Sequence, residues 1–473
     1  MMFLVAANLY GQKQGNIWMF GQGAAINFNS GTPVSFPGSE VYGEPSAPGD
    51  YGYSEGCTSI SDVNGNLLFY SNGDKVWNSR NQVMPHGDSL FGFYSSTTAA
   101  LAIPVPLSDS LYYLFTTDGL ERYLHHGLCY SLINMCEDQG LGDVIENQKN
   151  IHLLDIADEK LCAVALPDGT GVWLIAHKHF TNSFYAYLIT PTGINPPIIS
   201  NVGSVHTGSM GFYQGYGTAI GQMKASSDGK RLGLVFSNVT PSVAEVFDFD
   251  AASGVVSNVI GLQASNNEYG LEFSPDNTKL YTTNMSGLYQ FDLAAGSPAA
   301  INASMTQITS AGCIPGPLQL GPDGKIYVAR CTYVVGIIYK PNSPGLSCTF
   351  VNNGVNLTPG GHSTSLPSFI AGFQYHNDRI HSCGAASAGP DHPPTTLWEY
   401  PDMFSSAITI GTDGEMNNAS LLLFNMIGQE VMNQRNLSGR QVTLDASNLS
   451  AGVYILQLTE DSTTITRKIL VVR

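Results

Sequence analysis

The chain has 473 residues, of which 12% are charged and 51 are glycine, and its formal net charge is -17. Charged residues are about half as frequent as in an average soluble domain, and the acidic balance argues against a surface that binds nucleic acid phosphates. Apolar residues make up 43% of the chain, which is enough for two or three domains with their own cores. With 23 Tyr and little helical periodicity, the composition predicts an all-β protein rich in tight turns.

The chain begins with a short apolar run, residues 1–11. This run has the character of the end of a signal-peptide core without its basic start, so we expect the mature protein to begin near Gln12. A first β-strand is the alternative. No later run reaches the roughly 18 apolar residues that a membrane-spanning helix needs.

A turn containing Asp-Gly, Asn-Gly or Asp-Asn recurs through most of the chain, each time before a β-rich run. The turns lie at 61–66, 167–169, 227–230, 274–277 and 321–324. Asp-Gly and Asp-Asn supply the left-handed conformations that tight hairpins need. The later turns follow one another at intervals of roughly 50 residues, a period typical of propeller blades.

Residues 12–383 are therefore predicted to form a β-propeller of about seven blades, with six or eight as alternatives. A row of independent β-sandwich domains would also give regular strands. It would not so naturally place the same turn at one point of every unit, and we favour the propeller.

Two sets of residues resemble known propellers. The segment Leu271–Tyr281, which reads LEFSPDNTKLY, resembles the repeat of WD40-like and TolB-type propellers. Residues 55–62, 65–73 and 76–78 are similar to secreted Bacteroidota propellers that carry C-terminal sorting or gliding-motility domains. The resemblance implies architecture and an extracellular location, and it implies no chemistry.

The chain contains eight cysteines, and none of them forms a C-x-x-C motif. In an exported protein some should pair. Cys313 and Cys331 lie symmetrically about the turn at 321–324 and form one candidate disulfide; Cys348 and Cys383 form a second. Buried free thiols are the alternative for the other four.

Histidines and acidic residues offer the candidates for chemistry. His177 and His179 stand two apart at the end of a strand, so alternation places both on one face, a spacing that metal ligands use. No third ligand is visible, and an imidazole pair closing a strand is the preferred interpretation. We interpret the other histidines as loop or strand-end residues: His125, His126, His206 and His362.

The two densest acidic stretches, residues 137–143 and 155–159, lack the alternating ligand pattern of a calcium loop and are predicted to be solvated loops. No G-x-S-x-G motif occurs. We therefore predict no catalytic residue, no metal and no cofactor.

Two Gly-rich segments, residues 36–53 and 208–221, carry aromatic side chains. Loops on a rigid scaffold are where binding specificity usually resides, although the same rings could pack between blades. The candidate ligand-binding residues are Tyr42, Tyr51, Tyr53, Phe212, Tyr213 and Tyr216.

Residues 384–396 are small, polar and Pro-rich, and are predicted to be an interdomain linker. After them, residues 397–473 alternate strand-like runs with turns, as in a small immunoglobulin-like β-sandwich. Their order of motifs resembles the type A C-terminal sorting domain of the type IX secretion system. The motif residues are Gly428, Gly452, Tyr454, Lys468 and Arg473. An ordinary immunoglobulin-like binding module is the alternative.

The resemblance implies recognition by the type IX machinery, cleavage within the linker, and delivery to the cell surface or the medium after transit through the periplasm. The leading hypothesis for the propeller is a non-enzymatic module that binds glycan or protein. The alternative is an extracellular hydrolase or lyase with its site at the mouth of the propeller channel. An enzyme should bring two carboxylates, or a His-carboxylate pair, together at that mouth. A third option is a structural role at the cell surface.

Overall fold

The computed structural model describes residues 12–42, 54–208, 217–237, 243–263, 268–284, 286–310, 316–375, 397–400, 403–404, 407–425, 428–460 and 463–471. Among these residues the only α-helix is α1 (Pro298–Ala303). The short 3-10 helices are η1 (Lys13–Gly15), η2 (Leu120–Arg122), η3 (Asp138–Gly140), η4 (Glu146–Gln148), η5 (Gly345–Cys348) and η6 (Ala371–Phe373). Nearly everything else with regular structure is strand, which confirms the all-β prediction. The chain divides into two compact units, residues 1–383 and 384–473.

In the described part of the first unit, the strands form seven antiparallel sheets. The first three sheets are β1 (Ile17–Phe20), β2 (Ala24–Asn27) and β3 (Val34–Ser35); β4 (Thr58–Ser61), β5 (Leu67–Ser71) and β6 (Val76–Asn78); and β7 (Ala100–Pro104), β8 (Leu111–Thr117), β9 (Leu128–Asn134), β10 (Asp143–Val144) and β11 (Ile151–Leu154). The next two are β12 (Ala157–Ala165), β13 (Val172–Lys178), β14 (Ser183–Thr190), β15 (Gly193–Ile194) and β16 (Ile198–Asn201); and β17 (Met223–Ala225), β18 (Arg231–Val235), β19 (Val243–Asp250) and β20 (Val255–Gln263). The last two are β21 (Gly270–Phe273), β22 (Lys279–Asn284), β23 (Gly287–Asp292) and β24 (Thr306–Thr309); and β25 (Leu318–Leu320), β26 (Ile326–Ala329), β27 (Val334–Ile338) and β28 (Phe350–Asn356).

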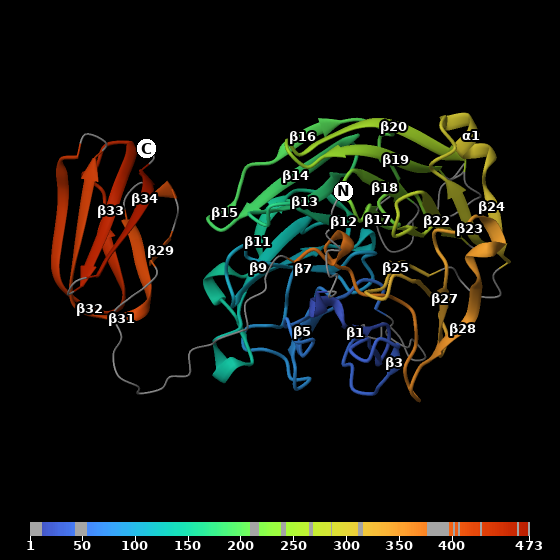
Figure 1. Ribbon diagram of the computed structural model, residues 1–473, viewed down its shortest axis with the longest axis horizontal. Coiled ribbons are helices and arrows are strands. Elements are labelled where there is room, and N and C mark those ends of the chain that lie inside the picture. Colours follow the sequence, from blue (N-terminus) through green and yellow to red (C-terminus); the bar gives the residue numbers. More distant parts are fainter. Residues whose placement is uncertain are drawn as a thin grey trace, which may run out of the picture. The chain divides into compact units, whose positions relative to one another are not determined.

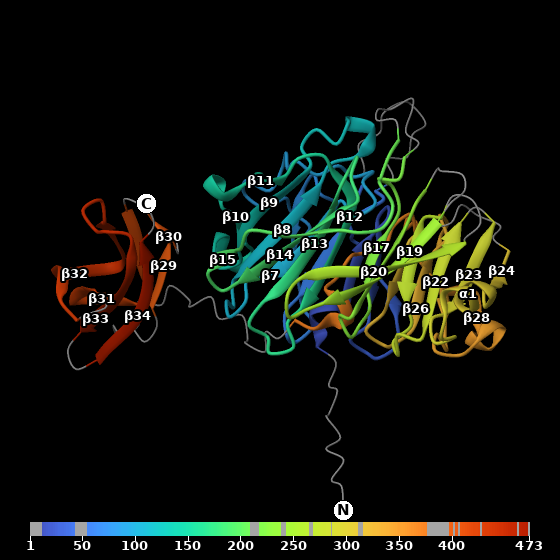
Figure 2. The ribbon, with the colours of Figure 1, turned by 90° about the horizontal axis from the view of Figure 1, so that it is seen from above.

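The sheets follow one another around a ring in chain order, which is the arrangement of a β-propeller (Figure 1). Strands β1, β7, β12, β17 and β25 lie near the centre, while β3, β16, β20, β24 and β28 lie toward the rim (Figure 1). Figure 2 shows the same sheets from the side. The number of blades remains a prediction.

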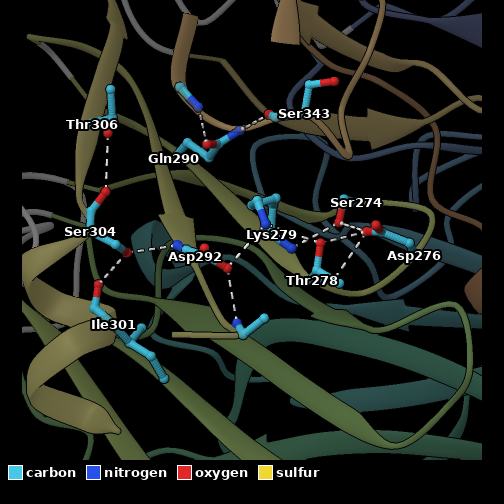
Figure 3. Close-up of polar contacts among 12 residues, drawn as sticks. Ser274, Asp276, Thr278, Lys279, Gln290, Asp292, Ile301, Ser304, Thr306 and Ser343 are labelled. Carbon is cyan, nitrogen blue, oxygen red and sulfur yellow. Dashed lines mark hydrogen bonds and ion pairs between the residues drawn. The ribbon is translucent and has the colours of Figure 1, made fainter. Parts of the chain in front are cut away.

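Each recurring turn precedes a strand, as predicted, and joins it to the first strand of the same sheet. The turn at 274–277 joins β21 to β22, and its Asp276 Oδ1 accepts hydrogen bonds from the hydroxyls of Ser274 at 2.7 Å and Thr278 at 2.9 Å (Figure 3). Two residues further on, Lys279 Nζ lies 3.0 Å from Asp292 Oδ1 of β23 (Figure 3). The short Asp side chain thus substitutes for backbone partners in the turn.

The ring is closed by a segment from the end of the unit. Residues 362–370 run beside the first and second sheets: His362 pairs with Gln22, and Ser368 N donates to Cys57 O at 2.8 Å. Buried Trp18 of β1 contacts the rings of Tyr327 in β26 and Phe369 in this segment, at centroid distances of 5.1 and 5.9 Å. First, last and closing parts of the propeller therefore share one aromatic core.

Strands β4, β7, β12, β17 and β21 begin at one end of the ring, which we call the mouth, and finish at the other, which we call the closed end. The segments that precede β4, β7, β17 and β21 contact one another or the first residues of β12, as detailed below. At the closed end, η6 and the residues around it cross the channel: Gly372 lies against Ser227, and Gln374 Nε2 donates to Ser227 O at 3.0 Å.

The second unit is a small β structure in which five strands follow the order β29-β31-β33-β34-β30, with β32 paired to β31. Its strands are β29 (Leu397–Tyr400), β30 (Met403–Phe404), β31 (Ala407–Asn425), β32 (Glu430–Asp445), β33 (Gly452–Glu460) and β34 (Thr463–Val471). The strand-like runs at 407–410 and 420–425 are parts of the single long strand β31. Bulges around Asn418, whose φ is 63°, let that strand bend without ending.

Candidate functional site

A tyrosine and a glutamate meet across the channel mouth. Tyr269, just before β21, donates its hydroxyl to Glu55 Oε2 at 2.8 Å, and Glu55 lies just before β4 in a sheet four places earlier. Burial raises the pKa of Glu55 to about 7; the hydrogen bond from Tyr269 opposes this shift, and the nearby charge of Glu121 adds to it. Glu55 is only partly buried, so a carboxyl group that titrates near neutrality faces the mouth.

Ser95 connects Glu55 to a second carboxylate. Its hydroxyl lies 3.0 Å from Glu121 Oε1 and 3.4 Å from Glu55 Oε1. A hydroxyl has one proton to donate and can accept another, so a protonated Glu55 can donate to Ser95 while Ser95 donates to Glu121. Glu121 belongs to η2, in the β8–β9 connection, and its Oε2 has no hydrogen-bond partner among the described residues. The three side chains form a path for one proton.

The neighbouring charged residues Glu159 and Lys160 form hydrogen bonds with the segments around the mouth. Glu159 accepts hydrogen bonds from Thr97 N, Thr97 Oγ1 and Leu120 N, at 2.9, 2.8 and 2.8 Å. Lys160 Nζ donates to the carbonyl oxygens of residues 219, 220 and 221, at 2.9, 2.7 and 3.0 Å. Burial raises the pKa of Glu159 and lowers that of Lys160. These residues hold the segments around the mouth together.

A β-bulge explains why consecutive charged residues are buried here. Ala157 pairs with Lys178 and Leu161 with Ala176, so four steps along β12 match two along β13. The extra residues aim Asp158, Glu159 and Lys160 at different partners, as bulges beside functional sites do. The prediction that residues 155–159 form a solvated loop is wrong for Asp158 and Glu159, which are buried in β12.

Asp158 gathers three histidines. Its Oδ2 contacts Nδ1 of His177 at 2.9 Å and Nδ1 of His206, and its Oδ1 contacts Nδ1 of His179 at 2.7 Å. All four side chains are buried. The shared face predicted for His177 and His179 is present, and His206, interpreted from the sequence as an isolated loop residue, completes the group.

The electrostatics of this group favour a charged Asp158 and a neutral His206. Burial alone would raise the pKa of Asp158, but the charge interaction with His206 and the hydrogen bonds from the histidines hold it well below its usual value. Burial lowers the pKa of His206 to about 3.

Toward the closed end the channel narrows to a cavity of about 30 Å³, the space of a water molecule. Lys224 and Glu272 line it, with Nζ and Oε2 3.8 Å apart, and Lys224 Nζ also donates to Gln319. Phe369, Ile370 and Phe373 lie over it.

The other predicted residues are distributed as follows. Tyr42 is 44% exposed, while Tyr51, Tyr53, Phe212, Tyr213 and Tyr216 lie outside the described residues. Cys313 and Cys383 also lie outside them, so both disulfides remain predictions; Cys348 is buried. His125 and His126 lie in the β8–β9 turn, as expected, and His126 stacks on Phe91.

In the second unit, Gly428 has a φ of 79° in the turn between β31 and β32. The Tyr454 hydroxyl donates to Ser450 O at 2.8 Å and fixes the turn before β33. Gly452 begins β33, Lys468 lies in β34 opposite Ile455, and Arg473 is outside the described residues.

Sequence reasoning did not identify Glu55, Ser95, Glu121 or Tyr269 as site residues. Glu55 stands three residues before β4, Tyr269 one residue before β21, and Ser95 five residues before β7. In a propeller, residues just before the first strand of each sheet gather at one end of the channel. Polar residues at these positions of the repeat could therefore have been predicted as candidates for a site.

The fold defines a class: a β-propeller protein with a C-terminal β-sandwich. The chain is similar to three solved structures, each with a TM-score below 0.5. They are a putative 6-phosphogluconolactonase from Bacteroides fragilis (14% identity, TM-score 0.42, covering 74% of this chain and 97% of that one), a putative TolB from Agrobacterium tumefaciens (11%, 0.29, 66% and 81%) and the Dos1 propeller (11%, 0.35, 64% and 83%). No curated protein matches the chain.

Residues 400–472 match the family of secretion system C-terminal sorting domains. The chain thus carries a type IX sorting domain, which directs export to the cell surface or the medium. Among the described residues, no helix is long and apolar enough to cross a membrane.

Proposed function

We propose that the propeller of this exported protein is an extracellular hydrolase or lyase, with an acid-base site at the channel mouth. Glu55 acts as the general acid or base, and Glu121 is the second carboxylate. The observation that supports this proposal is the convergence of both carboxyl groups on one hydroxyl, Ser95, with Glu55 titrating near pH 7. A group whose pKa lies near the working pH transfers protons most effectively.

A glycan is the substrate class that suits the site best. Most glycoside hydrolases use two carboxyl groups, one of them held protonated by its surroundings. Exposed tyrosines also surround this end of the channel: Tyr42 near the β1–β2 turn, Tyr123 in the β8–β9 connection and Tyr333 in the β26–β27 connection, with exposed fractions of 44, 62 and 65%. Such rings combine an apolar face with a polar hydroxyl, which suits stacking on sugars.

The same tyrosines support a second candidate, a module that binds glycan or protein without turnover. This was the leading hypothesis from the sequence. The two candidates differ in one respect: only the enzyme requires the carboxyl proton of Glu55.

The test is a glycan array followed by a reducing-end assay on every glycan that binds. In Glu55→Gln we expect turnover to fall by about 10²–10⁴-fold while binding is retained. Glu146→Gln is the matched control, because that carboxylate is 83% exposed on the outside of the third sheet. Glycan binding with no turnover in the wild-type protein would favour the binding module; turnover that survives Glu55→Gln would contradict the assigned role.

A further inference from the structure

Three imidazoles and one carboxylate converge in the fourth sheet, apart from the acid-base site. Asp158 lies at the start of β12, His177 at the end of β13, His179 directly after β13, and His206 in the connection that leads to β17. Each of these side chains is at most 1% exposed. The fold therefore brings three separate segments together around one buried carboxylate.

The ligand atoms point at a common place. Nδ1 of His177 and Nδ1 of His206 both face Asp158 Oδ2, and the two rings stack with centroids 3.4 Å apart and planes inclined by 22°. Because both nitrogens are directed at one oxygen, their lone pairs converge even though the rings are nearly parallel. One oxygen and two nitrogens of these residues lie within 4.8 Å of one another. Zinc bonds of about 2.0–2.2 Å to nitrogen and oxygen allow one ion to reach three atoms so placed.

Hydrogen bonding alone does not account for the group. If each Nδ1 carries the proton that Asp158 accepts, each Nε2 keeps a lone pair, and Nε2 of His177, His179 and His206 is buried without a partner. The surroundings are aromatic: Phe184 packs edge to face with His177, and Phe236 with His206, at 4.8 and 4.9 Å. Three unpaired acceptors in an apolar pocket are costly.

A cation between Asp158 and the Nδ1 atoms of His177 and His206 would change which ring nitrogen carries the proton. The imidazole protons of His177 and His206 then reside on Nε2, and the lone pairs on Nδ1 point at positive charge. His179 would hold the other oxygen of Asp158, the supporting role that hydrogen-bonded neighbours of ligating carboxylates play.

We propose that Asp158, His177 and His206 bind a divalent transition metal of the zinc class, with His179 as a positioning residue for the carboxylate. Imidazole and carboxylate ligands suit zinc and its first-row neighbours, whereas calcium prefers oxygen alone. The site ties the start of β12 to β13 and to the connection before β17. It is independent of the acid-base proposal.

The experiment uses the full chain, stripped with chelator, dialysed and titrated with zinc. Metal content is measured by mass spectrometry and thermal stability by Tm. We expect one tightly bound zinc per chain, a higher Tm with zinc, and no such response to calcium. Asp158→Asn and His206→Gln should lose the bound zinc, and His179→Gln should weaken it by about 10–100-fold. His152→Gln is the control, an exposed histidine that pairs with exposed Asp155.

Cobalt in the wild-type chain keeps the test independent of how well the variants fold. Visible d–d absorption without a thiolate charge-transfer band is expected for nitrogen and oxygen ligands. Wild-type protein that retains no zinc, or a thiolate band showing that cysteines bind the metal, would overturn the proposal. Full zinc content in both Asp158→Asn and His206→Gln would do the same.

Discussion

The two ends of the propeller channel differ in how their polar groups are used. At the mouth, the hydroxyl of Ser95 lies between the carboxyl groups of Glu55 and Glu121. The second oxygen of Glu121 has no hydrogen-bond partner among the described residues. At the closed end, Lys224 is paired with Glu272 and Gln319, and aromatic side chains cover them. Groups that are satisfied and covered stabilise a fold, whereas half-satisfied polar groups are candidates for chemistry.

The difference between the two ends also indicates from which end a ligand would approach the channel. The connections at the mouth carry exposed tyrosines, whereas phenylalanines of the closing segment and of η6 line the small cavity at the closed end. A ligand therefore meets the mouth first. The following changes test this contrast between the two ends.

The largest effect should come from opening the closed end. Phe369→Ala removes a buried ring that contacts Trp18 and Phe373, and should lower the free energy of unfolding by about 3–5 kcal/mol. Urea unfolding followed by tryptophan fluorescence measures it, with Tyr339→Ala, an exposed ring, as control. A loss below about 1 kcal/mol would mean that the packing of Phe369 at the closed end contributes little to the stability of the propeller.

At the mouth, stability should depend on pH through Glu55. Its pKa is raised from 4.5 to about 7 in the folded protein, so the folded state binds the proton more tightly than the unfolded state. The resulting stabilisation is fully present below pH 4.5 and is lost as pH rises through 7. Glu55→Gln cannot ionise and should gain about 1–3 kcal/mol relative to wild type between these limits. Parallel pH profiles of the two proteins would refute a raised pKa.

A smaller change should follow Tyr269→Phe, which removes one hydrogen bond across the channel at a cost of about 1 kcal/mol. The bond from Tyr269 opposes the upward shift of the Glu55 pKa, so its loss should move that pKa higher. The midpoint of the pH–stability profile measures the shift. A midpoint that moves downward would show that Tyr269 acts in another way.

The smallest effect on stability should follow Tyr123→Ala at the mouth. The ring is 62% exposed, so the free energy of unfolding should change by less than about 0.5 kcal/mol. If the exposed rings contact a ligand, the affinity for any glycan found on the array should fall. Unchanged affinity would remove Tyr123 from the binding surface.

The sequence predicts features that depend on residues close together in the chain. Each Asp-containing turn indicates one hairpin, and the repetition of the turn indicates successive small sheets. His177 and His179 share a face because they alternate on one strand. The site depends on contacts that no local pattern encodes. Tyr269 reaches Glu55 across 214 positions, and the bulge in β12 buries Asp158 and Glu159, although their acidic stretch resembles a loop. Recognition of the sorting domain rested on several ordered motifs, which is why it was specific.

The way the ring closes has a consequence for biosynthesis. Gly21 N donates to Ser365 Oγ across 344 positions, so the propeller cannot be completed until nearly all of its residues have been synthesised. The closing segment also ends before the predicted linker at 384–396. Proteolytic release of the sorting domain within that linker would leave the closing segment attached to the ring. A cut before Ser365 would remove the closing segment and leave a sheet edge exposed. Such an edge can pair with other chains, so we expect the cut protein to aggregate.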